Sequence, residues 1–382
     1  MLLLKQTSAI LSTYTADVSG VCSALYEMGG MTVMHDASGC NSTYNTHDEP
    51  RWYDMPSMVY ISALTEIDAL MGGDEKLIDD VSRAASELHP RFIALAGTPI
   101  PMIMGTDFKG VARLIEQRTG IPTFGFATNG MHSYDKGAGA ALAAIAERFC
   151  DSDVVRAPLS EDSQPVMGLL GVTPLDFSVT GNVEALKKIF ADNGFRVGCC
   201  WAMGSPWQEL MDVGKSHVNV VVSSCGAPLA ETLKRKYGTP YVTGLPVGRA
   251  VTRELFDRVR SAAKGEIPQV TCTASEESDG EVFVIGESVQ SNAIATALER
   301  DYAMRGVRVI SPLEFPDECG IFAELKGARI VIADPLYKPA LPRGCQLVAL
   351  PHEAYSGRIY RDSIPIIVGD GFNKWIEKEL AL

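Results

Sequence analysis

Several motifs that mark well-known chemistry are missing from this chain. It has no GxxxxGK[ST] loop, and no GxGxxG follows an expected strand, so we expect no ATP site and no dinucleotide site. It also lacks CxxC, HExxH and GxSxG motifs, which argues against the usual dithiol, zinc and serine-hydrolase sites. The chemistry of the protein must therefore come from less regular residues.

Basic runs and long apolar runs are missing as well. The net charge of −13 and a pI near 5.0 argue against nucleic acid as the main ligand, because phosphate binding needs clustered Lys and Arg. No apolar stretch is long enough to cross a bilayer, so we expect no membrane association. Lys5 interrupts the apolar start, and polar residues follow it, unlike a signal peptide. We therefore expect a cytoplasmic protein, in which the nine cysteines are thiols or metal ligands rather than disulfides.

Apolar strand-like runs alternate with helix-like stretches along the whole chain. This alternation is typical of α/β proteins whose parallel sheets are covered by helices. Because 382 residues exceed the size of a single core, we expect three Rossmann-like domains over residues 1–155, 156–276 and 277–382. The expected strands lie within 31–36, 58–64, 91–100 and 122–128, then 166–177, 195–203, 218–224 and 239–248, then 281–288, 307–313, 328–336, 345–351 and 363–371. Polar stretches at 156–165 and 273–280 separate the domains.

Ligands of such sheets bind at the carboxyl ends of the strands, so the segments that follow the strands are the first places to look for a site. Cys22 precedes a helical segment, and Cys40 follows the first strand beside Gly39. Thiolates are the usual ligands of iron–sulfur clusters, and glycine turns free backbone N–H groups to contact cluster sulfides. Buried structural thiols are the alternative interpretation, because free Cys is among the most buried residue types.

The order of several motifs resembles one family. HDASGC at 35–40 is similar to the H-x-x-x-G-C segment of nitrogenase molybdenum–iron protein subunits, and Cys22 lies upstream of it at a suitable distance. The segments GGDEKL, MGLLGVTPLDF, VNVVVSS to KYGTPYV, VIADPL and PHEAYSGRIY resemble later parts of the same family in the same order. The chain thus resembles nitrogenase component 1-type oxidoreductases from about Ser19 to Phe372.

The resemblance implies that Cys22 and Cys40 are cluster ligands and that Thr98 stands where the family has its third cysteine. Two thiolates per chain would then give four in a dimer, enough for one four-iron four-sulfur cluster between two identical or homologous chains. The family also implies an ATP-dependent, iron-protein-like reductase as electron donor. Its small-molecule substrate would be reduced in the cleft between the domains.

The family's catalytic cofactor binds a cysteine in the second domain and a histidine in the third. Here Ser223 falls near the first position, Cys225 lies two residues beyond it, and His352 falls near the second. Because a metal site needs its full ligand set, we favour the absence of an iron–molybdenum-type cofactor, with Cys225 as a possible second-site ligand.

Further candidates each have two interpretations. His35, Asp36, His132 and His352 are candidates for proton transfer during reduction, or they are structural hydrogen-bonding and loop residues. Tyr355 and Arg358 could bind an anionic group or fix a turn. Cys199 and Cys200 point to opposite faces of one strand, which favours core packing over joint ligation. We expect Cys150, Cys272, Cys319 and Cys345 to be structural.

Two other functions remain open from the sequence. The first is a scaffold on which a metallocluster is assembled and handed on, as in nitrogenase-like assembly proteins. The second is an α/β ligand-binding protein without metal.

Overall fold

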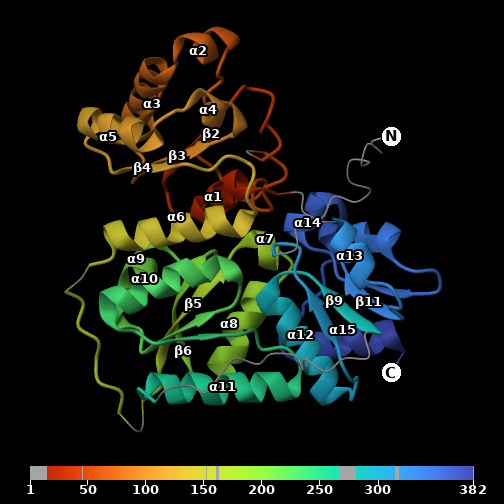
Figure 1. Cartoon of the computed structure of the whole chain (residues 1–382). Helices are drawn as coiled ribbons and strands as arrows, with labels where there is room; N and C mark the ends of the chain where they lie inside the picture. The colour runs from red at the N-terminus through yellow and green to blue at the C-terminus, as the bar shows by residue number, and fades with distance from the viewer. Residues whose placement is uncertain are drawn as a thin grey trace, which may run out of the picture.

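The computed structural model describes residues 15–44, 46–151, 153–160, 163–266, 281–314 and 318–381. Its strands form three four-stranded sheets, and every strand pair in them is parallel. Figure 1 shows the first sheet and its helices at the top, the second sheet below it, and the third to the side. We call these three parts, each a sheet with its helices, the first, second and third blocks. The predicted domain boundaries remain a prediction.

The first block is built on a sheet with the strand order β2-β1-β3-β4. Its strands are β1 (Met31–His35), β2 (Val59–Ile61), β3 (Ile93–Gly97) and β4 (Thr123–Phe126). Its helices are α1 (Asp17–Leu25), α2 (Glu66–Met71), α3 (Asp74–Leu88), α4 (Pro99–Met104), α5 (Phe108–Thr119) and α6 (Tyr134–Phe149). In α3 the buried residues are Leu77, Ile78, Val81 and Ala85, a helical spacing that places one apolar stripe on the core.

The second block has the strand order β6-β5-β7-β8. Its strands are β5 (Val166–Val172), β6 (Arg196–Ala202), β7 (Val218–Val221) and β8 (Tyr241–Thr243). Its helices are α7 (Pro174–Phe177), α8 (Asn182–Asp192), α9 (Trp207–Met211), η1 (Asp212–Lys215), η2 (Ser224–Gly226), α10 (Ala227–Tyr237) and α11 (Arg249–Ala263). β5 and β7, the central strands, are almost entirely buried, as expected for a parallel sheet covered on both faces.

The third block repeats the topology with the order β10-β9-β11-β12. Its strands are β9 (Val282–Ile285), β10 (Arg308–Ile310), β11 (Ile330–Ala333) and β12 (Gln346–Ala349). Its helices are α12 (Ser288–Asp301), α13 (Glu318–Glu324), η3 (Pro335–Ala340), α14 (Glu353–Ser356), η4 (Gly357–Ser363) and α15 (Asp370–Leu380). The α/β prediction of three parallel sheets flanked by helices is confirmed.

The shared strand order gives each sheet one point where the chain direction across the sheet reverses. It lies between β1 and β3, between β5 and β7, and between β9 and β11. Helices on either side diverge there and leave room for a ligand at the carboxyl ends of the strands. These three points determine where candidate side chains can gather.

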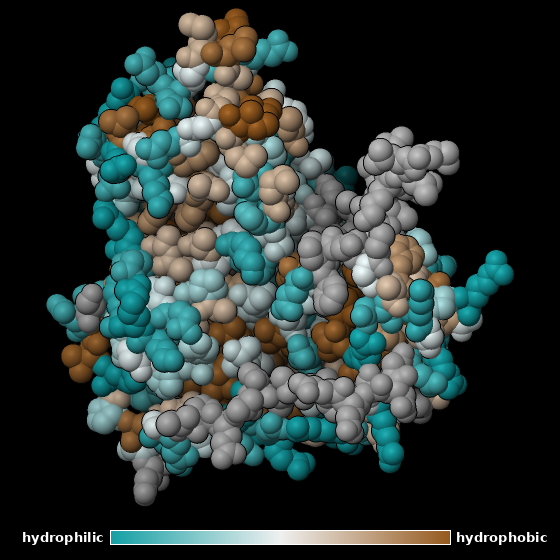
Figure 2. Space-filling model, viewed as in Figure 1, coloured by the Kyte–Doolittle hydropathy of each residue, from teal (hydrophilic) through white to brown (hydrophobic). Residues whose placement is uncertain are grey.

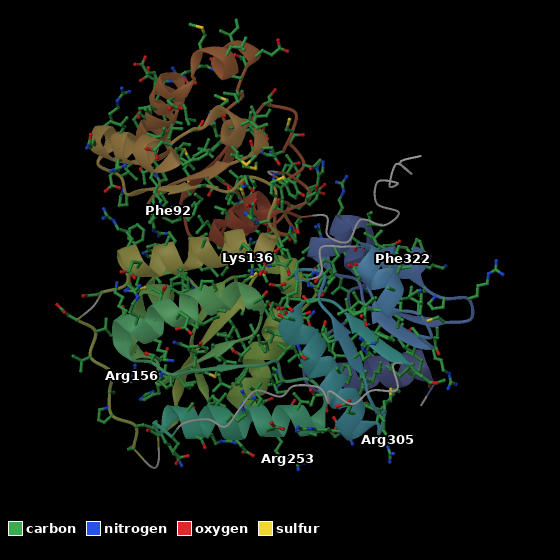
Figure 3. All side chains as sticks on the ribbon, viewed as in Figure 1. Phe92, Lys136, Arg156, Arg253, Arg305 and Phe322 are labelled. Carbon is green, nitrogen blue, oxygen red and sulfur yellow. The ribbon has the colours of Figure 1, made fainter. Side chains whose placement is uncertain are left out.

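The first block packs on the second through α1 and α6, which share one core cluster with residues of β5, β6 and α10. Figure 1 shows α6 lying between the first sheet and the second block. Phe92, labelled in Figure 3, packs in the same cluster, and its ring stacks on Trp207 of α9 with centroids 6.1 Å apart. Gly30 is required beside it, because an added Cβ would lie 2.1 Å from the Phe92 ring. The aromatic contact joins the two blocks.

One predicted strand is wrong. Residues 363–371 form no ladder strand and make a single bridge from Gly369 to Val247, because this segment leaves the third sheet to pack on the second block. There Ile367 N donates to the Asn182 side chain, and Gly369 N donates to the carbonyl of Pro246. The polar stretch 273–280, Cys272 and the side chain of Cys319 lie outside the described residues.

The other cysteines away from the candidate sites are packing residues where they are described. Cys199 and Cys200 are fully buried in β6 and belong to different core clusters, as their opposite directions predict. Cys150 is buried and Cys345 is half-buried. In the part of the chain that the structure describes, no helix is long and apolar enough to span a bilayer.

Candidate functional site

The reversal point of the first sheet holds most of the predicted cluster-site residues. His35 and Gly97 are partners in the register of β1 and β3, so Asp36 and Thr98 both follow the aligned ends of these strands. The Thr98 hydroxyl donates to the His35 carbonyl at 2.8 Å, and Thr98 is fully buried. The residue at the position of the family's third cysteine therefore holds two strand ends together.

Cys40 lies on an exposed turn that Asp36 organises. One Asp36 carboxylate oxygen accepts the Ala37 N–H at 2.8 Å, and the other accepts the Asn41 amide at 2.5 Å. The Cys40 N–H donates to the Ala37 carbonyl at 3.1 Å. Asp36 thus bonds to residues on both sides of Cys40 and fixes how the turn leaves the strand.

Gly39 is exposed and has no packing reason to be glycine. A Cβ added there would meet nothing within 4 Å, and its φ is not in the left-handed region. Among the described residues, nothing therefore explains the missing side chain. A close approach to the backbone by a group outside this chain would explain it.

Cys22 has the opposite environment. It lies inside α1 with 4% of its surface exposed, and burial raises the pKa of its thiol to about 12. In the structure it is a neutral thiol within the core cluster shared by the first and second blocks. A thiolate at this position would need a nearby cation for its stabilisation.

A buried ion-pair network connects the Cys40 segment to the helix that carries Cys22. The Arg51 guanidinium bonds Glu49 at 2.6 Å, Glu27 at 2.9 Å and the Ser23 carbonyl at 2.7 Å. The Ser23 hydroxyl donates to Glu49 at 2.9 Å. Because Ser23 directly follows Cys22, the segment beyond Cys40 is anchored next to the buried thiol.

The donor set of this chain fits a cluster that another chain helps to hold. Across the described residues, no three His, Cys, Asp or Glu side chains are grouped as a metal site. Two thiols lie on elements that are joined to each other, one of them on an exposed turn, and a four-iron cluster shared with a second chain would need two thiolates from each. Cys22 and Cys40 would hold it.

The two histidines predicted in the first block lie in different settings. His35 Nδ1 is 2.7 Å from the Ser62 hydroxyl, and burial lowers the pKa of its ring, which is neutral at pH 7. His132 is exposed, and its carbonyl accepts the Asp17 N–H at 3.0 Å. The structure gives the His132 side chain no interaction that points to chemistry.

The reversal points of the second and third sheets meet each other. Glu287 follows β9, and Ser224 follows β7. The Ser224 N–H donates to the Glu287 carboxylate at 2.8 Å. The Gln290 side-chain amide donates at 2.9 Å to the backbone carbonyl of Asp176, which follows β5. Asp334, after β11, accepts the His352 N–H at 2.9 Å. Backbone and side-chain groups that follow five strands, β5, β7, β9, β11 and β12, thus close one buried polar region between the second and third blocks.

Asp176 is at the centre of this region, and it lies next to both candidate ligands of a second cofactor. Tyr134 of α6 donates to one carboxylate oxygen at 2.5 Å, and Cys225 lies 3.3 Å from the other. His352 Nε2 is 3.6 Å from Asp176 Oδ1. The sequence placed Cys225 and His352 in separate domains, and the fold brings them to one carboxylate.

The pKa values of the groups in this region are shifted towards their neutral forms. Burial raises the pKa values of Asp176 and Cys225, and burial with the nearby Asp176 raises the pKa of Glu287 to about 7. Burial also lowers the pKa of His352 to about 3. Asp176 and its hydrogen bonds lie between Cys225 and His352, so these residues do not fit joint ligation of a metal cofactor.

The remaining predicted residues have structural contacts. Ser223 donates to the Gly171 carbonyl at 2.7 Å. Tyr355 is buried and stacks on His352 with ring centroids 4.4 Å apart. Arg358 is half-exposed and lies 3.7 Å from Asp48.

Sequence reasoning missed Asp176, Glu287, Tyr134, Asn41 and Arg51. Asp176 and Glu287 were detectable as carboxylates directly after expected strands. No local pattern marks Tyr134 or Arg51, because their roles depend on contacts between distant segments.

Comparisons with known proteins agree with this fold. The family model for nitrogenase component 1 type oxidoreductases matches residues 18–304, well over half of the chain. A solved nitrogenase, Cp1 at pH 6.5, superimposes with a TM-score of 0.67 at 15% identity, covering 100% of this chain and 94% of that one. At this identity the superposition shows the fold alone.

Curated relatives match in part. One subunit of the light-independent protochlorophyllide reductase of Nostoc punctiforme is 24% identical over 52% of this chain and 40% of its own length. The nitrogenase molybdenum–iron protein alpha chain of Clostridium pasteurianum is 23% identical over 48% of this chain and 33% of its own length. The iron–molybdenum cofactor biosynthesis protein NifE of Methanosarcina barkeri is 27% identical over 47% of this chain and 39% of its own length. The chain thus spans less than half of the length of these relatives. By the match over residues 18–304, it belongs to the nitrogenase component 1 type oxidoreductase family.

Proposed function

We propose that this chain is a nitrogenase-like reductase subunit that holds half of an iron–sulfur cluster through Cys22 and Cys40. The observation that carries the proposal is the Cys40 turn. It is exposed, it is shaped by Asp36 and Asn41, and it includes a glycine that no packing contact explains. A second chain would supply the other two thiolates, giving one four-iron four-sulfur cluster between the subunits.

An apolar surface on the same block supports a partner chain. α2 has no buried residue, and its Ile67, Leu70 and Met71 are 72%, 85% and 81% exposed. α4, which contacts α2 and begins directly after Thr98, exposes Ile103 to 81%. Figure 2 shows this hydrophobic surface at the top of the first block. Exposed apolar side chains gathered in this way are typical of protein interfaces.

The partner in this proposal is an identical chain or a homologous subunit. When bound, the cluster would supply single electrons at the edge of the first block. A separate ATP-dependent reductase resembling the nitrogenase iron protein would deliver them, since this chain has no phosphate-binding motif of its own.

The substrate in this proposal is a small molecule reduced between the three blocks. The buried region around Asp176 supports this location, because Tyr134, Asp176 and Glu287 come from different blocks and keep exchangeable protons away from water. A reduction consumes protons as well as electrons, and a buried carboxyl group whose pKa is raised to about 7, as for Glu287, is a suitable proton donor near neutral pH. His35 and Asp36 remain predicted proton carriers near the cluster.

A scaffold for metallocluster assembly is the second candidate. The matched NifE of Methanosarcina barkeri is a cofactor biosynthesis protein, and it is 27% identical to this chain, against 24% for the protochlorophyllide reductase subunit. A scaffold would use the same Cys22 and Cys40 site. It would release its cluster stoichiometrically to an acceptor protein, whereas a reductase would turn over substrate and keep its cluster.

The proposal is tested on anaerobically purified full-length protein. Its mass in solution is measured by light scattering, and iron and sulfide are counted per chain. A shared four-iron cluster predicts dimers with about two iron atoms and two sulfides per chain. Monomers without iron after anaerobic reconstitution would exclude an identical chain as the partner, and absence of iron also after reconstitution with a homologous subunit would contradict the proposal and favour a metal-free binding protein.

A further inference from the structure

A large cavity lies where residues 363–371 pack on the second block. It measures about 910 Å³ and is lined by α8, the start of α11 and most of α15, helices that Figure 1 labels in the lower half of the molecule. This volume is within the ~300–1,000 Å³ of pockets that hold small ligands. No residue of the Asp176 region or of the Cys22–Cys40 site lines this cavity.

The three helices of the cavity meet at Gly369. Its N–H donates to the Pro246 carbonyl at 2.7 Å, and it forms a bridge with Val247, so α11 and α15 begin side by side. Its φ is +57°, and an added Cβ would lie 2.7 Å from Cδ1 of Ile189 in α8. Backbone conformation and space thus both require glycine here. The cavity is therefore built from backbone contacts between regular elements.

Cationic side chains from all three helices line this cavity. Lys188 of α8 is paired with Asp192 at 2.6 Å. Three further cations have no side-chain hydrogen bond or ion pair among the described residues, namely Arg249, Lys374 and Lys378. Lys374 and Lys378 are four residues apart and therefore share one face of α15. In a chain with a net charge of −13, this concentration of unpaired cations favours an anionic ligand.

The charge of the lining also indicates the charge of the ligand. Asp370 is the one carboxylate of the lining besides Asp192, and it lies in the first turn of α15, where the helix dipole stabilises a negative charge. Four cations and two carboxylates leave the lining with a net charge of +2. A phosphate monoester, which carries about −1.5 to −2 charges at neutral pH, matches this value.

The rest of the lining is apolar and includes an aromatic ring. Trp375 is half-buried and packs on Phe372 with ring centroids 6.0 Å apart. Ile189 and Ile366 lie in the same lining, and Ile366 is 39% exposed. A tryptophan ring is a good platform for a flat ring system, and a ligand that covers these side chains removes apolar surface from water. The ligand therefore needs a flat ring body as well as its charge.

We propose that this cavity is a second ligand site, which binds the phosphate ester of a flat ring system. The phosphate lies among Arg249, Lys374 and Lys378, and the ring lies against Trp375. No sequence motif marks the site, because its cations come from separate segments of the chain. The proposal does not depend on the iron–sulfur cluster or on the Asp176 region.

Titration calorimetry of the full-length protein with three probes tests the site. The probes are 1-naphthyl phosphate, 1-naphthol and inorganic phosphate, which separate the ring from the charge. We expect one 1-naphthyl phosphate per chain, bound at least about tenfold more tightly than either other probe, since ring and charge both contribute. Raising the salt concentration from about 50 to about 500 mM should weaken binding of the ester and leave 1-naphthol unchanged.

Variants of α15 assign the two parts of the site. The double variant Lys374→Gln with Lys378→Gln should weaken ester binding by about tenfold and leave 1-naphthol unchanged. The double variant Lys326→Gln with Lys338→Gln removes the same charge from exposed positions outside the lining and should bind as the wild type does. Trp375→Leu should weaken binding of both ring probes by about tenfold, and its thermal unfolding shows whether it is folded.

Four results would overturn the proposal. The first is no binding of the ester to the wild type, and the second is binding of inorganic phosphate or 1-naphthol as tight as that of the ester. The third is an equal loss in the two double variants, which would indicate attraction by net charge alone. The fourth is unchanged ester binding in folded Trp375→Leu.

Discussion

The Cys22–Cys40 site and the Asp176 region use similar residues in opposite ways. At the first, Cys40 is exposed on a turn beside an open glycine, and the set of metal ligands is incomplete within the described chain. At the second, Cys225 and His352 are buried and lie against Asp176, which also accepts Tyr134. The first arrangement needs something from outside the chain, whereas the second has its own partners.

On the proposed account, family position alone does not make a cysteine a ligand. The family resemblance predicts a second-site role for Cys225 and His352, yet the Asp176 carboxylate, which has its own hydrogen bonds, lies next to both of them. Among the described residues the Cys40 thiol has no such partner, and Asp36 holds its turn through Ala37 and Asn41. The four predictions that follow, in order of expected size, test this contrast.

The largest effect is expected at Arg51, which anchors the Cys40 segment to α1. Arg51→Ala leaves the buried Glu49 carboxylate without its cationic partner and should lower the free energy of unfolding by about 3–5 kcal/mol. Urea unfolding measures it. Arg118→Ala is the control, because its pair with Asp79 is exposed on both sides and should cost under ~1 kcal/mol. Equal losses of unfolding free energy in both variants would show that Arg51 does not anchor the Cys40 segment to α1.

The second effect concerns pH and the Asp176 region. The folded pKa of Glu287 is about 7, above its usual 4.5, so the folded state binds the proton more tightly than the unfolded state. Unfolding free energy should therefore fall as pH rises from about 4.5 to about 7, by about 3 kcal/mol for one such group, and then level off.

Glu287→Gln should flatten this slope, and Asp176, whose pKa is raised as well, should preserve part of it. Glu147→Gln is the control. Glu147 is exposed, and its pKa is lowered by its hydrogen bond to Arg235, so its contribution to stability is constant above about pH 4.5 and is lost only below it. Urea midpoints measured from pH 4 to 8 report the slopes. A slope unchanged in Glu287→Gln would mean that Glu287 is ionised in the folded protein.

The third effect tests how the Cys40 turn is held. Asp36→Ala removes both hydrogen bonds of the carboxylate and should speed amide hydrogen exchange at Ala37 and Cys40 by about tenfold. The double variant Asp36→Asn with Asn41→Asp reverses donor and acceptor and should restore slow exchange. If the double variant exchanges as fast as Asp36→Ala, the side-chain bond does not hold the turn.

The smallest effect is expected at Cys225. A serine hydroxyl can replace the thiol as donor to Asp176, so Cys225→Ser should change the unfolding free energy by about 1 kcal/mol or less. Iron content of the anaerobic protein should stay at the wild-type level. A loss of iron in this variant would show that the Asp176 region binds metal after all.

The fold could be predicted from the sequence to a large extent. Alternating strand and helix patterns locate the three parallel sheets, since buried parallel strands are continuous apolar runs. Residues 363–371 look like another strand because they are apolar, but their partner is the second block through Asn182 and Pro246. A local apolar pattern does not reveal which distant part of the chain the segment packs against.

The candidate sites could be predicted only in part. The sequence identified the strand-end segments and Cys40. It could not show that Thr98 bonds the His35 carbonyl, or that Asp176 separates Cys225 from His352, because these contacts join different strands and blocks. The Cys22 and Cys40 ligand roles remain predictions.

Iron and sulfide analysis with electron paramagnetic resonance, on anaerobic Cys40→Ser and Cys22→Ser protein, tests the central claim most directly. Cys40→Ser is the sharper variant, because Cys40 is exposed and its loss leaves the core intact. Cys345→Ser, half-buried in the third block, is the matched control. The account predicts that both ligand variants lose the cluster signal and most of their iron, while Cys345→Ser keeps both. A wild-type cluster in Cys40→Ser and Cys22→Ser would contradict it.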